Sequence, residues 1–386
     1  MILINHPHIH DIAAQYADAL FKKFEAKKNM INHIVNILGN QDDYERNIQP
    51  MRGVSAIRLL LGEDFEVPSG KTLNDKADIL YHNIERYRAS SALQITCAVN
   101  INRIKEQLEI IFTFDSLKKL FSEEIDQLKG LNESFINGGV LHSDVYAHFF
   151  DYTKYYITLN KYIGQELGII CCPYCNRNYI SYVFSPKGKI IGPTYDHFFN
   201  KKTYKYIALS FFNLIPSCTI CNSNLKNAID FDLTTHLYPY RDDFGKNAFF
   251  DFDLKLVDTS EEKKIIFRPT IVLAKDISPE DELKLMGGKD KKGEGSIKVF
   301  RLREIYETHY DTVEEVYQKF SANNPYYAQS IKKNLDLLGV GKEEFYRFHF
   351  HNYYDSSDFH RRPLAKLTKD IYTKMEQVKK DTSTGI

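Results

Sequence analysis

Apolar residues recur at three- and four-residue intervals through the first 165 residues, with polar residues between them. This spacing is typical of amphipathic helices. It predicts a long helix that ends at Gly39, and a later one that begins near the capping-box pair Thr72 and Asp75. The helices are expected over residues 11–38, 54–61, 72–112, 116–131 and 144–167. Residues 1–165 are therefore predicted to form an all-helical domain, either a scaffold or a platform for a partner.

The pattern changes after residue 166. Runs rich in β-branched and aromatic residues predict two pairs of strands joined by turns, and helical spacing then returns towards the end of the chain. The strands are expected over residues 178–184 and 190–198 with a turn at 185–188, and over 249–257 and 264–273 with a turn at 258–262. Helices are expected over 218–229, 297–320, 326–338 and 364–378, a loop over 286–296 and a frayed tail over 379–386. The fold class is therefore α+β, mainly helical, with domains 1–165, 166–240 and 241–386.

Two Cys-x-x-Cys pairs mark the predicted middle domain. They supply Cys172, Cys175, Cys218 and Cys221, and four thiolates of this kind form a closed tetrahedral zinc site. Six cysteines in 386 residues without a secretory leader do not favour disulfides. Because Cys171 precedes the first pair, which of the two neighbours binds stays open.

Four polar residues lie in or beside the segment between these pairs: Asp196, His197, Asn213 and Asn222. Carboxylate and amide oxygens suit Mg²⁺ or Mn²⁺, and a neutral imidazole can take up a proton near neutral pH. The set is compatible with a metal site that acts on phosphate. Each residue also has a structural reading, because Asp196-His197 can be a satisfied pair, Asn213 a turn residue and Asn222 a helix-start residue.

Basic and histidine side chains near the pairs allow two readings each. Arg177 and Lys226 are either phosphate contacts or solvated surface charges. His236 could line the site, although a structural role is favoured for it.

Together these motifs resemble the HNH endonuclease superfamily, whose fold is a ββα-metal unit. The resemblance covers residues 166–240 and rests on Asp196-His197, Asn213, Asn222 and Lys226 inside the two cysteine pairs. It is closest to the HNH proteins of bacterial anti-phage systems, such as the nuclease partners of Septu and of some retrons, which usually have an ATPase companion.

The resemblance implies a role for each matched residue. His197 would be the general base, Asp196 and Asn222 the ligands of one divalent ion, and Asn213 the residue that orients the histidine. Some family members have a third histidine where this chain has Asn222. That difference favours an oxygen-ligated Mg²⁺ or Mn²⁺ ion over a catalytic zinc.

Charge and composition limit how nucleic acid could be held. The chain has 51 basic and 51 acidic residues, whereas proteins that bind nucleic acid alone often have a basic excess. A protein partner is therefore expected to help hold the substrate, and the resemblance implies an ATPase in this role. No apolar run is long enough to span a membrane, and a cytoplasmic location is expected.

The sequence thus predicts a zinc-stapled, metal-dependent endonuclease that acts on DNA within an anti-phage defence complex. An RNA-cleaving nuclease, with tRNA as one substrate, is the nearest alternative. A non-catalytic zinc-binding adaptor that displays a nucleic-acid or protein surface is the other.

Overall fold

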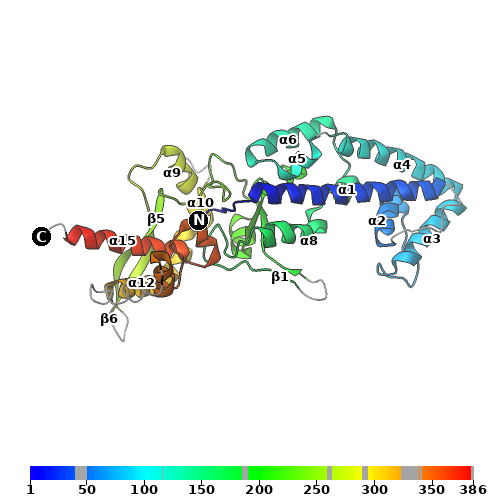
Figure 1. The fold of residues 1–386 in the computed structure, drawn as a ribbon. Helices are drawn as coiled ribbons and strands as arrows, with labels where there is room; N and C mark the ends of the chain where they lie inside the picture. The colour runs from blue at the N-terminus through cyan, green and yellow to red at the C-terminus, as the bar shows by residue number, and fades with distance from the viewer. Residues whose placement is uncertain are drawn as a thin grey trace. The chain divides into compact units, whose positions relative to one another are not determined.

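The chain folds into two units in the computed structural model, which describes residues 1–39, 50–114, 116–184, 190–258, 263–288, 294–322, 339 and 341–383. The helical unit comprises His10–Leu159 and Lys201–Asn213. The cysteine unit comprises Met1–Ile9, Asn160–Asn200 and Leu214–Ile386. These limits differ from the predicted domains, because residues 201–213 leave the predicted middle domain and join the helical unit. Figure 1 shows the elements of each unit.

The helical unit is built along one long helix, α1 (Ile9–Gly39), as the sequence predicted. Phe24 of α1 lies in an aromatic core, with ring centroids 5.2 Å from Phe121 and 5.4 Å from Phe149. Tyr206, from the later segment of the unit, packs 4.4 Å from Phe135. The other helices are α2 (Pro50–Leu61), η2 (Gly62–Asp64), α3 (Lys76–Ala89), α4 (Ser91–Phe112), α5 (Leu117–Ser122), α6 (Ile125–Gly138), α7 (Ser143–Phe149), η3 (Tyr152–Tyr155), α8 (Tyr156–Leu159), η5 (Lys205–Ile207) and η6 (Phe211–Asn213).

Three of the predicted helices are interrupted. The run over 72–112 divides at Ser90, whose extended backbone and side chain cap α4 by accepting a hydrogen bond from the amide of Leu93. The run over 116–131 divides at Glu123 and Glu124, which are also extended. The run over 144–167 consists of α7, η3, α8 and the π-helix η4 (Asn160–Glu166). Apolar spacing continues across such breaks, so periodicity alone did not locate them.

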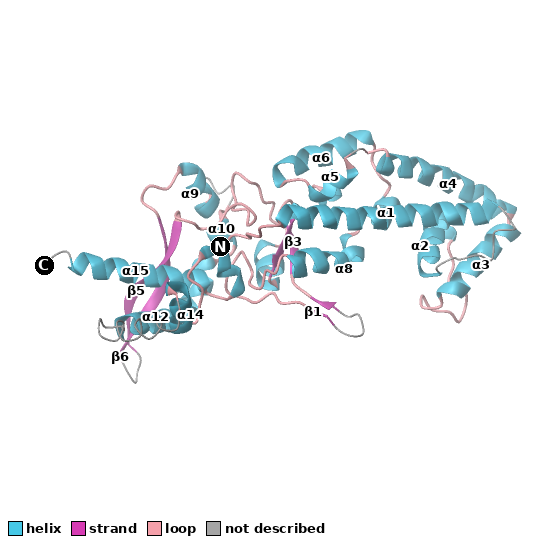
Figure 2. Ribbon diagram, in the orientation of Figure 1, coloured by secondary structure: helices cyan, strands magenta, loops and turns pink. Residues whose placement is uncertain are grey.

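The cysteine unit contains three two-stranded antiparallel sheets within the described residues (Figure 2). Their pairs are β1 (Val183–Phe184) with β2 (Ile190–Ile191), β3 (Thr194–His197) with β4 (Leu214–Ser217), and β5 (Ala248–Asp258) with β6 (Lys263–Leu273). The N-terminal segment of the chain also belongs to this unit. The amide of Ile2 donates a hydrogen bond to the carbonyl of Pro173 at 2.9 Å.

The predicted hairpin over 178–198 is wrong in part. Only two residues of each strand pair, and the second predicted strand is divided at Gly192 and Pro193. A Cβ at position 192 would lie 2.1 Å from Oδ1 of Asn160, so this close approach requires glycine. Beyond the break, β3 pairs with β4, and His197 lies opposite Leu214. The partner strand of β3 therefore follows a long intervening segment, residues 198–213, and is not joined to β3 by a tight turn.

The rest of the cysteine unit combines the predicted β5–β6 pair with helices. α12 (Tyr310–Ala322) contacts β6, and α15 (Ala365–Ser383) contacts β5. Lys374 of α15 forms an ion pair with Asp251 of β5 at 2.6 Å. The remaining elements are α9 (Pro279–Met286), α10 (Ser296–Val299), α11 (Leu302–Tyr306), η7 (Ile220–Lys226), η8 (Glu307–His309), α14 (Lys342–Phe350) and η9 (Ser356–Arg361).

Two predictions for this region need correction. The helix expected over 297–320 is broken after α10 by Arg301, which has a left-handed backbone with φ of 48°. The tail is helical to Ser383, where fraying was expected from Lys379. Several predicted segments lie outside the described residues: the helix over 326–338, the turn over 185–188, residues 259–262 of the other turn and residues 289–293 of the loop predicted over 286–296. No helix among those described is long and apolar enough to cross a membrane.

Candidate functional site

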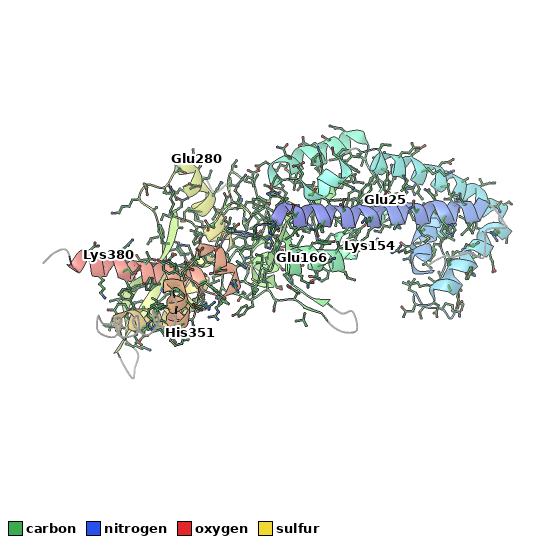
Figure 3. The ribbon with its side chains drawn as sticks, viewed as in Figure 1. Glu25, Lys154, Glu166, Glu280, His351 and Lys380 are labelled. Atoms are coloured by element: carbon green, nitrogen blue, oxygen red, sulfur yellow. The ribbon has the colours of Figure 1, made fainter. Side chains whose placement is uncertain are left out.

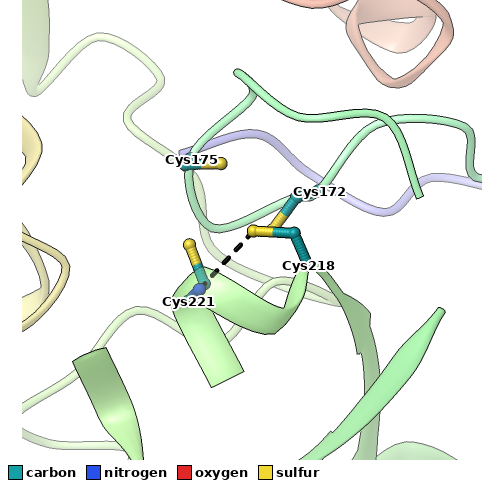
Figure 4. Close-up of side chains that lie close together, drawn as sticks. All are labelled: Cys172, Cys175, Cys218 and Cys221. Carbon is teal, nitrogen blue, oxygen red and sulfur yellow. Dashed lines mark hydrogen bonds between the residues drawn. The ribbon is translucent and has the colours of Figure 1, made fainter. Parts of the chain in front are cut away.

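The two cysteine pairs meet in the cysteine unit (Figure 4). The Sγ atoms of Cys172, Cys175, Cys218 and Cys221 all lie within 4.8 Å of one another, and all four residues are buried. A tetrahedral zinc site has Zn–S bonds of about 2.3 Å, which bring its sulfurs to such separations. The four cysteines could therefore hold a zinc ion. Cys171 does not belong to the group, and burial raises the pKa of its thiol to about 12.

Local hydrogen bonds shape both cysteine turns. In the first turn, the amide of Asn176 donates to the carbonyl of Cys172 at 2.7 Å, and the amide of Cys172 donates to Asn178 at 2.9 Å. In the second turn, the amide of Cys221 donates to Sγ of Cys218 at 3.5 Å, and Nδ2 of Asn178 donates to the same sulfur at 3.3 Å. N–H donors of this kind stabilise thiolates. None of the six cysteines forms a disulfide.

Asn176 anchors the first turn to the end of the chain. Its side chain is fully buried, and its Nδ2 donates to the carbonyls of Phe359 at 2.9 Å and Arg362 at 3.3 Å. Its Oδ1 accepts from the amide of Lys366 at 3.0 Å. Its backbone is left-handed, with φ of 46°, a conformation that asparagine tolerates better than most residues. One residue thus connects the cysteine turn to α15.

This geometry predicts that two substitutions of Asn176 lower the free energy of unfolding by different amounts. Asn176→Gly removes the buried hydrogen bonds but keeps the left-handed backbone, and should lower the free energy of unfolding of the cysteine unit by about 2–3 kcal/mol. Asn176→Ala should lower it by roughly a further 1 kcal/mol, because the Cβ disfavours this conformation. Urea denaturation would measure both values, and zinc content should not change. Equal stabilities for the two variants would contradict the backbone argument.

Asp196 of β3 lies in a buried network. Its Oδ1 is 3.0 Å from Nζ of Lys226, and its Oδ2 accepts a hydrogen bond of 2.6 Å from the hydroxyl of Tyr174. The side chains of Asp196 and Lys226 are 3% and 2% exposed. Lys226 also donates to the carbonyl of His197 at 2.8 Å and lies 4.6 Å from the ring centroid of Phe231. Burial, with Asp196 as the next cause, raises the pKa of Tyr174 well above its usual value.

The burial of Lys226 contradicts the reading of this residue as a solvated surface charge. Its ammonium group is shared between Asp196 and the carbonyl of His197. Lysine has three N–H donors, and two of them are directed to these oxygens. A direct phosphate contact by Lys226 stays a prediction that would require this buried ion pair to open.

Removing one member of this buried ion pair should be costly. Lys226→Met keeps the length of the side chain but leaves Asp196 without its cation, and should lower the free energy of unfolding by about 3–5 kcal/mol. The double variant Asp196→Asn with Lys226→Met should lose less unfolding free energy than the two single variants lose in sum, because neither charge is then left unpaired. Chemical denaturation of the unaltered protein, the two single variants and the double variant provides the four unfolding free energies of this double-mutant cycle. Additive losses would show that the pair is not coupled.

His197 lies on β3 beside Asp196 in the sequence, whereas Asn222 lies on η7. His197 ends β3 and is 7% exposed. β4 runs antiparallel to β3 and leads through Cys218 into η7, where Asn222 is half-buried and its amide donates to Cys218 at 3.0 Å. The segment therefore has the order strand, strand, helix, with a cysteine pair at the helix start. The helix predicted over 218–229 is shorter than expected, and η7 is a π-helix.

Asn213 belongs to the helical unit by its contacts. It is fully buried, and its Nδ2 donates to the carbonyl of Ile207 at 3.2 Å. In the sequence it directly precedes Leu214, the strand partner of His197. The predicted role of Asn213 in orienting the histidine stays a prediction.

Arg177 and His236 have well-defined environments. Nε of Arg177 donates to Nε2 of His309 at 2.7 Å, and burial together with Arg177 lowers the pKa of His309. His236 is buried and stacks on Phe231, with ring centroids 3.9 Å apart. Burial lowers its pKa to about 4. The environment of His236 agrees with the structural role favoured for it, and a phosphate contact by Arg177 stays a prediction.

Tyr174, Asn176 and Asn178 are important residues that the sequence analysis passed over. Tyr174 lies between the two cysteines of the first pair, and its hydroxyl donates a hydrogen bond to Asp196. The two asparagines follow the first pair, and an asparagine directly after a cysteine turn is a signal for the left-handed residue found at position 176. The partners of all three residues are distant in the sequence, so their roles could not be derived from local pattern.

Comparisons with protein-family models, with curated proteins and with solved structures gave no match. The chain is therefore described by what its own residues provide: an α+β fold, mainly helical, with a cluster of four buried cysteines that could hold zinc.

Proposed function

We propose that the chain is a metal-dependent endonuclease of the HNH type. The observation that supports this most is the order of β3, β4 and η7 around the cysteine cluster, with Asp196 and His197 at the end of β3 and Asn222 on η7. This order of strand, strand and helix supports the proposal, because the resemblance implies a ββα arrangement. DNA is the proposed substrate, and the proposed setting is an anti-phage defence complex in the cytoplasm, where six unpaired cysteines suit a reducing environment.

The proposed reaction is hydrolysis of a phosphodiester bond. His197 takes a proton from the attacking water as the new oxygen–phosphorus bond forms, and the leaving oxygen departs from phosphorus as the old bond breaks. Asp196 and Asn222 would hold a Mg²⁺ or Mn²⁺ ion, which supplies charge stabilisation at the phosphate. Each carboxylate oxygen has two lone pairs, so Asp196 can accept from Lys226 and Tyr174 and still offer an oxygen. Lys226 and Tyr174 fix the direction of that carboxylate.

A non-catalytic adaptor is the second candidate, and two observations favour it. Asp196 is almost fully buried in an ion pair, and His197 is only 7% exposed. In this reading both residues stabilise the fold, and the zinc-stapled unit displays a binding surface. Substitution of Asn222, which is half-buried and outside the ion pair, would then leave biological activity unchanged.

A cleavage assay tests the proposal. Purified protein is incubated with plasmid DNA or with total RNA, in Mg²⁺, in Mn²⁺ and with EDTA. We expect cleavage of DNA that needs either ion and stops with EDTA. Cleavage of RNA alone would assign the nuclease to the RNA alternative. Because a net charge of zero suggests that a partner holds the substrate, the assay is repeated on the complex isolated from the native host. Absence of cleavage there as well would exclude the nuclease and favour the adaptor.

A further inference from the structure

The helical unit contains a cavity of 260 Å³. It lies beside the middle of α1, between that helix, α2, the end of α7 and the η3 turn; Lys154 of η3 is labelled in Figure 3. A wider depression of 590 Å³ adjoins it and shares Ser55, His148 and Lys154 with it. The residues that line the cavity are Lys23, Ala26, Lys27, Met30, Arg52, Ser55, Ala56, His148, Lys154 and Tyr155.

Positive charge dominates this lining. Lys23, Lys27, Arg52 and Lys154 contribute four cations, and no aspartate or glutamate of the described residues lines the cavity. Within the described part of the chain, no ion pair joins any of these four side chains to a carboxylate. Asp151 is close enough to affect Lys27, but its Oδ1 accepts from the amide and hydroxyl of Thr153 at 3.1 and 2.7 Å.

Lys27 forms the floor of the cavity. Its Nζ donates to the carbonyl of His148 and to the hydroxyl of Tyr155, each at 2.6 Å, and lies 4.4 Å from the ring centroid of Tyr155. A lysine has three N–H donors, so one is left to meet a ligand. Burial, followed by the charge of Lys154, lowers the pKa of Lys27 to about 7. Among the described residues, Asp151 is the carboxylate that affects this half-buried ammonium group, but the two do not form an ion pair.

His148 adds a polar group that the protein leaves without a partner. It is 7% exposed, its Nδ1 lies 3.4 Å from Oγ of Ser55, and its buried Nε2 has no hydrogen-bond partner among the described residues. Because this nitrogen is shielded from the cavity by protein atoms, it is an unsatisfied group within the cavity wall and is not counted among the groups that contact a ligand. Burial lowers the pKa of His148 to about 3, which keeps the ring neutral.

We propose that this cavity binds the phosphoryl group of a small phosphorylated ligand. Lys27 meets the phosphoryl oxygens from the floor, while Lys23, Arg52 and Lys154, which are exposed, close around them from the rim. A guanidinium group suits this ligand, because its forked donors bind phosphate oxygens in pairs. The anion supplies the negative charge that the four cations lack, and charge-assisted hydrogen bonds of this kind are the stronger ones.

The size of the cavity favours a phosphate or diphosphate group over a whole drug-sized ligand, which usually occupies roughly 300–1,000 Å³. The adjoining depression of 590 Å³ has space for the remainder of the molecule. Arg58 and Asp144 line that depression, and Asp144 is already paired with Arg103 at 2.7 Å. This site lies wholly within the helical unit, so it does not depend on the proposed nuclease.

Calorimetric titration of the full-length protein at low salt tests the site, with inorganic phosphate, pyrophosphate and a single-stranded oligonucleotide as probes. We expect pyrophosphate to bind with a dissociation constant of roughly 1 mM or tighter. Arg52→Gln, on the exposed rim, should weaken it about tenfold, and Lys27→Met should weaken it at least as much. Lys105→Met is the matched control, since Lys105 is an exposed lysine on α4 outside the cavity.

Each outcome bears on the proposal. Loss of pyrophosphate binding in Arg52→Gln, with unchanged melting temperature and normal binding by Lys105→Met, supports it. Absence of phosphate and pyrophosphate binding to the unaltered protein overturns it, as does equal binding by Arg52→Gln. Binding of the oligonucleotide alone, weakened by the same variant, would also overturn it and would assign the basic surface to a nucleic-acid backbone instead.

Discussion

Removing the zinc ligands is expected to unfold the cysteine unit while the helical unit survives. A structural zinc site contributes on the order of 10 kcal/mol to folding, which is comparable to the whole stability of a domain. The cluster joins two turns that lie 42 residues apart in the sequence, from Cys175 to Cys218. Without the metal, the link that holds these two turns together is lost.

The measurement uses Cys175→Ser, with zinc content and limited proteolysis as readouts. We expect the variant to lose its zinc and the segments at residues 160–200 and 214–383 to become cleavable. Fragments that span residues 10–159 should resist, because the aromatic core around Phe24 lies within the helical unit. Cys171→Ser is the matched control: it also alters a buried cysteine, but one outside the cluster, and it should keep its zinc. Zinc loss in the control with retention in Cys175→Ser would show that the ligand set is wrong.

The second large effect concerns His197. If it is the general base, His197→Ala should fold normally, keep its zinc and cleave DNA about 10²–10⁴-fold more slowly. The substitution removes a proton acceptor at the end of β3, while the cysteine cluster and the Asp196–Lys226 ion pair stay in place. Rates would be compared under single-turnover conditions, in the complex if the isolated protein is inactive.

His236→Ala serves as the control for His197→Ala. Both histidines are buried in the cysteine unit, at 3% and 7% exposure, so both substitutions leave a space of the same kind. His236→Ala should lower the melting temperature and leave the cleavage rate of the folded protein unchanged. Asn222→Ala complements the pair, because loss of a ligand to the divalent ion should raise the Mg²⁺ concentration needed for cleavage. Full activity of His197→Ala would exclude the histidine as the base.

Much of the local structure follows from the sequence. The spacing of Tyr16, Leu20 and Phe24 is sufficient to predict α1, since the buried face of a helix produces a regular period of apolar residues in the sequence. The two Cys-x-x-Cys pairs likewise predicted the four cysteines that gather, because few other arrangements place four thiols at such spacing. The strands of the β5–β6 pair were predicted from two runs of β-branched and aromatic residues separated by a turn, because such residues favour strands.

Tertiary structure decided the features on which the chemistry depends. β3 pairs with β4 and not with the preceding strand. This pairing follows from the break at Gly192 and Pro193 and from strand contacts between segments that residues 198–213 separate. The ion pair of Asp196 and Lys226, the hydroxyl of Tyr174 and the anchor at Asn176 join residues far apart in the chain. The cation-lined cavity likewise combines α1, α2 and α7. Periodicity reports which face of a segment is buried, whereas the partner of a buried charge depends on which distant segment packs against that face.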